Sequence, residues 1–182
     1  GQFTYDGLDS TDVLIAAYDT AGTHLWTTMF NAPPSWTTDH VNGRETIEDL
    51  QVDAEGNVHI TGTQFAGNGW RDDYMIVKLD ADGDLLWHQY YGAGTNWDDP
   101  RAMLVDDVGN VYVTGRCDAA PEGYSPVHTV AYSASGEQIW YAPYTTGYWD
   151  GCYPGMVDWD HNDHMYVGAS SNGQNGGQLF LL

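Results

Sequence analysis

Short hydrophobic runs separated by turn residues fill most of the chain, and residues 73–116 show the pattern most clearly. The runs YMIVKL, DLLWHQYY, RAMLVD and NVYVTG are rich in β-branched and aromatic residues, and each is too short for a convincing helix. DADG separates the first pair of runs and DVGN the second. Both are typical of tight hairpin turns, in which Asp bonds its own backbone and Gly adopts a positive φ. The segment is therefore predicted to form two antiparallel hairpins.

The hairpin pattern repeats along the chain. VDDVGNVYVTG, which contains Asp106, nearly repeats VDAEGNVHITG, which contains Asp53, and VDWDHNDHMYVGA, which contains Asp158, is a more divergent third copy. Aligned on these three residues, the copies lie 53 and 52 residues apart. Repeats of this length with four short strands each are typical of β-propeller blades. We therefore predict an all-β fold of four-stranded antiparallel blades.

We assign the chain to a single repeat domain over 1–182, with blades at 12–63, 73–116 and 126–169 and the first strand of a further blade at 176–182. About three blades do not close a propeller, which usually has four to eight. We therefore expect an incomplete propeller. It is either a fragment of a longer protein or a chain that completes its sheets with other copies of itself, because open sheet edges favour pairing with further strands.

One large aromatic residue marks each repeat. Trp26, Trp87 and Trp140 close the comparable segments YDTAGTHLW, LDADGDLLW and YSASGEQIW. A blade buries its apolar surface against the next blade, and one indole ring per repeat covers a large area. We therefore expect these residues to pack between neighbouring blades.

A family resemblance appears at this point. DYMIVKLDADGDLLWHQYYG followed by VDDVGNVYVTG resembles the SBBP repeat, also called the seven-bladed β-propeller repeat, of bacterial secreted or surface proteins. The resemblance extends over nearly the whole chain and is strongest in the second repeat. It implies a propeller fold and an extracellular or cell-surface location. It supplies no common catalytic motif that can be transferred to this chain.

The charge of the chain restricts its partners. There are 26 acidic residues against five Lys and Arg, which gives a formal net charge of −21. Nucleic acids and anionic membrane surfaces are therefore poor partners, and no run of 18 apolar residues predicts membrane insertion. The acidity fits a solvated surface in a salty medium, a cation-binding surface, or attraction to a basic partner.

The two cysteines, Cys117 and Cys152, are expected on the rim between adjacent blades. Since the resemblance is to secreted proteins, a disulfide between them is one expectation. Two separate buried thiols are the alternative.

The longer connections carry a recurring pair of residue types. PSWTTD, GTNWDD and GYWDGC each place an Asp shortly after a Trp, and GNGWRDD adds a further Trp. These connections should emerge on one face of a propeller. That face could stack indole rings on sugars, anchor a protein partner, or fold back to cap its own blades. The candidate ligand-binding residues are Trp36, Trp70, Trp97, Asp98, Trp149 and Asp150.

The divergent third copy predicts a longer turn in which residues with oxygen ligands alternate along the chain. Its candidate metal ligands are Asp158, Asp160, Asn162 and Asp163. This spacing could surround Ca²⁺, although the loop lacks the usual Gly and the downstream bidentate Glu. His161 and His164 could bind a transition metal instead, and a solvated turn without metal is the remaining alternative.

Catalytic motifs are missing from the sequence, which contains no nucleophile elbow, no HExxH and no phosphate-binding loop. We therefore expect a noncatalytic extracellular module for structural assembly, adhesion or protein interaction. A carbohydrate-binding module assisted by calcium is the alternative. A fragment of a propeller enzyme is the third hypothesis.

Overall fold

The computed structural model describes residues 12–30, 45–65, 72–92, 97–117, 126–144, 152–160, 162, 164–171 and 179–181. Thirteen strands and no helix occur in these residues. The strands are β1 (Val13–Tyr18), β2 (His24–Phe30), β3 (Asp49–Val52), β4 (Val58–Phe65), β5 (Asp72–Leu79), β6 (Leu85–Tyr91), β7 (Asp98–Val105), β8 (Val111–Cys117), β9 (Val127–Tyr132), β10 (Gln138–Tyr144), β11 (Cys152–Trp159), β12 (Met165–Ser171) and β13 (Leu179–Leu181).

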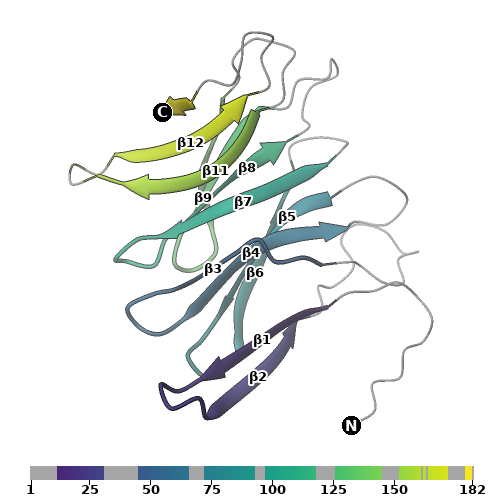
Figure 1. Ribbon diagram of the computed structural model, residues 1–182, viewed down its shortest axis with the longest axis vertical. Coiled ribbons are helices and arrows are strands. Elements are labelled where there is room, and N and C mark those ends of the chain that lie inside the picture. Colours follow the sequence, from purple (N-terminus) through teal and green to yellow (C-terminus); the bar gives the residue numbers. More distant parts are fainter. Residues whose placement is uncertain are drawn as a thin grey trace.

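Four antiparallel sheets follow one another along the chain (Figure 1). β1 and β2 form a two-stranded sheet at one end of the molecule. β3-β4-β5-β6 and β7-β8-β9-β10 form two four-stranded sheets, and β11-β12-β13 form a three-stranded sheet at the other end. Within each sheet, strands that are consecutive in sequence pair with each other, as in propeller blades. The predicted all-β fold of four-stranded antiparallel blades is confirmed.

The blade boundaries differ from the prediction by two strands. The segment 73–116 contributes β5 and β6 to the sheet begun by β3 and β4, while its β7 and β8 begin the next sheet. The segments 12–63 and 126–169 are divided in the same way, and β13, expected to begin a further blade, is the third strand of the last sheet. The reason is that β4 pairs with β5 through eight residue pairs. Turn signals identify hairpins but not which hairpins share a sheet.

Six hairpin turns of one design lie together at the left side of Figure 1. In each turn the backbone N–H of the first residue donates to the carbonyl of the fifth, as from Asp53 to Asn57 at 3.0 Å. The side chain of the first residue, Asp in five turns and Ser in one, accepts from backbone N–H groups of the same turn. Five of the turns have Gly in fourth position with φ between 81° and 88°. The turns are 19–23, 53–57, 80–84, 106–110, 133–137 and 160–164. Five of the 26 acidic residues therefore stabilise turns.

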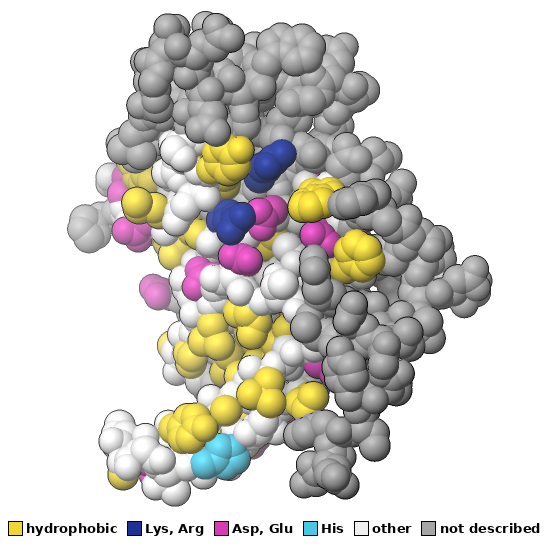
Figure 2. All heavy atoms as spheres, turned by 45° about the vertical axis from the view of Figure 1, so that its right-hand side comes forward, with side chains coloured by type: hydrophobic (Ala, Val, Ile, Leu, Met, Phe, Trp, Pro, Cys, Tyr) yellow, Lys and Arg dark blue, Asp and Glu magenta, His cyan; other side chains and the backbone are white. Residues whose placement is uncertain are grey.

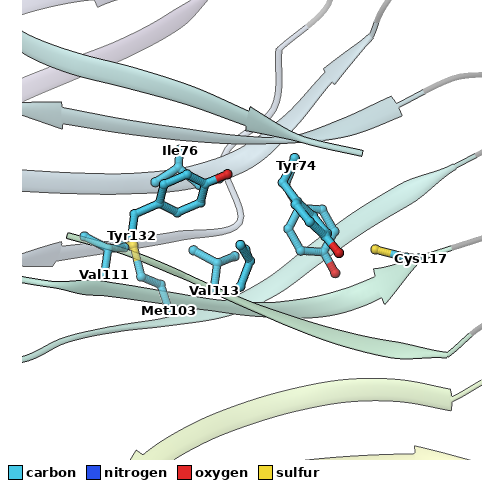
Figure 3. Close-up of a cluster of buried hydrophobic side chains, with 9 residues drawn as sticks. Tyr74, Ile76, Met103, Val111, Val113, Cys117 and Tyr132 are labelled. Atoms are coloured by element: carbon cyan, nitrogen blue, oxygen red, sulfur yellow. The ribbon is translucent and has the colours of Figure 1, made fainter. Parts of the chain in front are cut away.

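Apolar cores fill the spaces between successive sheets. Val13, Ile15 and Phe30 of the first sheet pack against residues of β4 and β5 that include Ile60 and Met75. A second cluster lies between the two four-stranded sheets (Figure 3). Because each core is shared, each sheet depends on its neighbours for burial.

Two of the three marker tryptophans join neighbouring sheets. The Nε1–H of Trp26 donates to the carbonyl of Ala81 at 2.8 Å, and that of Trp87 donates to the carbonyl of Ala134 at 3.0 Å. Each acceptor lies in the turn between the third and fourth strands of the next four-stranded sheet. The prediction that these residues pack between blades is confirmed for Trp26 and Trp87.

Polar side chains also connect the sheets. Asp49 on β3 accepts the backbone N–H of Met103 on β7 at 2.9 Å, and Gln51 accepts that of Val105 at 3.2 Å. The first strands of two neighbouring sheets are therefore held together by side chain to backbone hydrogen bonds.

In the described part of the chain, no helix is long and apolar enough to cross a membrane.

Candidate interaction surfaces

Two of the predicted ligand-binding residues, Trp97 and Asp98, lie at the end of the sheets opposite the tight turns. Trp97, directly before β7, is 49% exposed, whereas its neighbour Asp98 is fully buried. The strand alternation sends the two side chains to opposite sides, so Asp98 does not share an exposed surface with Trp97. The other four predicted ligand-binding residues lie outside the described residues: Trp36, Trp70, Trp149 and Asp150.

Asp98 instead belongs to a buried polar cluster that the sequence did not reveal. Its neighbours include Cys117 and Tyr74, both fully buried, and Figure 3 shows Tyr74 and Cys117 at the same end of the core. Burial and then the nearby charge of Asp98 raise the pKa of the Cys117 thiol well above its usual value. The thiol is therefore protonated at neutral pH, which makes it a poor nucleophile.

The same cluster continues to His128 on β9. The Tyr91 hydroxyl and His128 Nδ1 are 2.8 Å apart, and the Tyr74 hydroxyl donates to the His128 carbonyl at 3.4 Å. Burial lowers the pKa of His128, so the ring is neutral at physiological pH. These contacts join β5 and β6 of one sheet to β9 of the next, and we interpret the cluster as a polar part of the interface between them.

The predicted disulfide stays a prediction. Cys117 is a free thiol in this structure, and the side chain of Cys152 lies outside the described residues. The expected place of the two cysteines can be checked for the backbone: Cys117 ends β8 and Cys152 begins β11, in neighbouring sheets.

The predicted calcium ligands are distributed over a strand and a turn. Asp158 lies within β11, where its Oδ1 accepts the N–H of Trp159 at 2.8 Å, and Asp160 is the first residue of the following turn. Asn162 is exposed, and Asp163 lies outside the described residues. No group of three or more His, Cys, Asp and Glu side chains that could hold a metal occurs in the part of the chain that the structure describes. Calcium binding therefore remains an untested prediction.

The turn 160–164 of the third copy is not longer than the other turns, which corrects the alignment of that copy on Asp158. The N–H of Asp160 donates to the carbonyl of His164 at 2.9 Å, with the span found in 53–57 and 106–110. Asp160 is thus the equivalent of Asp53 and Asp106. Its Oδ1 accepts backbone N–H groups, while its Oδ2 lies 3.0 Å from His164 Nδ1 and accepts from the Tyr166 hydroxyl. The carboxylate is already engaged within its own turn.

A buried ionic cluster at the second turn was also missed from sequence. Asp53 Oδ2 accepts the Nε2–H of His59 at 2.9 Å and lies 3.5 Å from Lys78 Nζ, and all three side chains are buried. Burial opposes ionisation of Asp53, but hydrogen bonds from His59 and Asn57 outweigh it and lower its pKa well below the usual value. The signal in the sequence is Lys78, the only lysine, inside the apolar run YMIVKL.

Buried histidines predict a loss of stability in mild acid. Burial lowers the pKa of His59, His88 and His128 below the usual value near 6.5. The unfolded chain therefore binds more protons than the folded chain below about pH 6.5. The free energy of unfolding should be constant above that pH and should decrease as the pH falls below about 6.5.

Urea unfolding at a series of pH values tests this prediction. The variant His128→Gln should show a shallower decrease than the natural protein, because one of the three rings with a lowered pKa no longer titrates. Equal stability at pH 7.5 and 5.5 would contradict the assignment of these rings as neutral in the folded protein.

The end sheets expose apolar faces. On the outer face of the first sheet, Leu14, Tyr18 and Met29 are 55%, 62% and 48% exposed. Figure 2 shows hydrophobic side chains gathered toward the end of the molecule where β1 and β2 lie. At the opposite end, Met156 on β11 is 68% exposed and Tyr166 on β12 is 37% exposed. These two faces are therefore candidate interaction surfaces.

Comparison with protein families identifies one segment. Residues 86–119, from β6 to just beyond β8, match the family model described as the SBBP β-propeller repeat. A search of curated proteins finds no match to this chain. The matched residues include Trp87 and the turn 106–110, whose roles in sheet packing and turn formation are described above. The resemblance seen in the sequence is therefore confirmed for residues 86–119, the segment that matches the SBBP β-propeller repeat.

Proposed function

We propose that this chain is a noncatalytic extracellular module that acts in structural assembly, by packing its end sheets against further sheets. The observation that carries the proposal is a comparison of equivalent positions. Leu14 and Tyr18 stand in the positions that Met75 and Leu79 occupy in the next sheet, counted from the turns 19–23 and 80–84. Met75 and Leu79 are fully buried beneath a neighbouring sheet, whereas Leu14 and Tyr18 are more than half exposed.

The other end shows the same contrast. Tyr166 and His59 are equivalent positions, because each lies six residues after the first residue of its turn and within reach of that carboxylate. His59 is fully buried under the next sheet, whereas Tyr166 is 37% exposed. Apolar sheet faces of this kind are typical of interaction sites rather than of free surfaces.

The remaining features support a structural role. The buried cysteine is protonated, and the buried histidines and carboxylates make contacts between sheets or within turns. The extracellular location rests on the resemblance to secreted and surface proteins. The proposed partners are the end sheets of other copies of this chain.

Sedimentation velocity over a wide range of protein concentration tests assembly through the end faces. We expect concentration-dependent association, and Met156→Glu should weaken it because a charge would be placed on an apolar contact surface. Val108→Glu is the matched control, since Val108 is 72% exposed in a turn away from both end faces. A protein that stays monomeric at every concentration would overturn the proposal.

Carbohydrate binding is the second candidate, and the exposure of Trp97 at the loop end favours it. An exposed indole can stack on the apolar face of a sugar ring. A glycan array with the natural protein and Trp97→Ala tests it, with and without added calcium. A signal that Trp97→Ala loses would support a lectin, and no signal would remove this candidate.

A further inference from the structure

Each contact between a marker tryptophan and a turn joins two surfaces, the indole ring of one sheet and a tight turn of the next sheet. Trp26 covers the turn 80–84 and Trp87 covers the turn 133–137. The Gly in each turn lies so close that a Cβ atom added to Gly83 or Gly136 would approach the indole ring within 2.7 to 2.9 Å. The turn and the ring are therefore complementary surfaces.

Among the described residues, one turn of this kind has no tryptophan covering it, and one tryptophan of this kind has no turn to cover. The turn 19–23 has the same backbone, but a Cβ atom added to Gly22 would meet nothing within 4 Å. Trp140 on β10 stands in the position of Trp26 and Trp87 and makes a ring contact with Tyr112 of its own sheet. The three-stranded sheet β11-β12-β13 has no turn between third and fourth strands in its described part, so Trp140 has no such turn to cover there.

The end sheets are two complementary halves of one blade. β11 and β12 take the first two strand positions, as β3 and β4 do, whereas β1 and β2 take the third and fourth, as β5 and β6 do. β13 fills the third position only in part. It pairs with Gly168–Ser170, whereas β4 and β5 form eight pairs, and no described strand pairs with Met165–Val167 on that edge.

We propose that the β1–β2 hairpin of a second copy binds beside β12 in the place of β13 and completes the three-stranded sheet. The turn 19–23 of that copy would then lie beneath Trp140. Leu14, Tyr18 and Met29 would face the preceding sheet β7-β8-β9-β10, just as Met75 and Leu79 face the preceding sheet β1-β2 within the chain. This inference rests on the proposed function and specifies its partner and its geometry.

A second copy is the occupant because it carries both halves of the contact. The two surfaces are different, so the association is head to tail and adds one copy after another unless a ring closes. Each copy carries a formal charge of −21, which opposes association. Assembly should therefore become stronger as added salt screens the repulsion.

A mixing experiment with two variants tests the arrangement. Leu14→Glu damages the hairpin half, and Trp140→Ala damages the receiving half. Each variant alone should lose about tenfold or more in association affinity. A mixture should recover a dimer but no larger species, because the intact hairpin of Trp140→Ala can bind the intact receiving sheet of Leu14→Glu. Sedimentation velocity with one variant fluorescently labelled measures this, and Val108→Glu should assemble like the natural protein.

The outcomes separate this inference from the proposed function. If Leu14→Glu alone abolishes assembly and Trp140→Ala assembles normally, the hairpins bind one another, which overturns the inference and leaves the assembly function. If the natural protein does not assemble, both are overturned. Circular dichroism confirms that each variant is folded. Should Trp140→Ala fail to fold, Trp140→Phe keeps an aromatic ring but loses the N–H, and the same recovery on mixing is expected.

Discussion

Replacing Asp53 with Ala is expected to lower the free energy of unfolding by about 4 kcal/mol. The carboxylate accepts the backbone N–H groups of Glu55 and Asn57, so its loss removes the hydrogen bonds that hold the turn. It also leaves Lys78 buried without its nearest carboxylate, and the Nε2–H of His59 without its acceptor. An uncompensated buried charge accounts for most of the expected loss, because removing one partner of a buried pair costs far more than removing an exposed one.

Asp160→Ala is the matched control, because Asp160 is the first residue of the turn 160–164, as Asp53 is of the turn 53–57. It accepts the same kind of backbone N–H bonds, but its side-chain partners His164 and Tyr166 are exposed. Its loss should be much smaller, and the difference between the two variants isolates the buried ionic cluster. Urea unfolding measures both variants. Equal losses at the two sites would mean that the turn alone matters and that the cluster around Lys78 adds nothing.

A double variant tests the buried charge directly. Asp53→Ala combined with Lys78→Met should regain about 2 kcal/mol relative to Asp53→Ala, since no buried ammonium group then lacks a partner. If the double variant is less stable than the single one, Lys78 contributes mainly through other contacts.

The local features of the fold could be predicted from sequence because they depend on neighbouring residues. An Asp followed by Gly in the fourth position determines a tight turn, and β-branched runs on both sides determine the strands. The choice of strands that share a sheet depends on the connections between hairpins. The segment 66–71 connects two strands of one sheet and 93–96 connects two sheets, yet neither has a residue pattern that distinguishes the two kinds of connection. The blade boundaries were therefore placed two strands away from their actual positions.

The candidate sites were harder to predict for two physical reasons. In DWDHNDH, Asp163 stands where other turns have Gly, so the turn was aligned on Asp158 instead of Asp160. Polar strand residues such as His59 and His128 predict a solvent-exposed side of an amphipathic strand. Both sides of an inner blade are covered by other sheets, however, so these residues are buried. Burial on both sides is a tertiary property, which the alternation of residue types does not reveal.

Gly83→Ala should lower the free energy of unfolding by about 3 kcal/mol, from two causes that a control can separate. Gly83 has φ of 88°, which an Ala residue adopts at a cost of about 1 kcal/mol. The added methyl group would also lie 2.7 Å from the Trp26 ring and from Thr28 Oγ1, so the neighbouring sheet must move away. Overpacking of this kind typically costs about 1 to 3 kcal/mol.

Gly22→Ala is the control, because φ is 81° and a Cβ atom there meets nothing within 4 Å. It should therefore lose only the conformational part, and thermal or urea unfolding of the two variants gives the packing part as their difference. Adding Trp26→Ala to Gly83→Ala should cost less than Trp26→Ala costs in the natural protein, since the clash disappears with the ring. Equal losses for Gly22→Ala and Gly83→Ala would show that Trp26 does not press on this turn. In assembled protein, Gly22→Ala should lower the free energy of unfolding as much as Gly83→Ala does, if Trp140 of a second copy covers the turn 19–23.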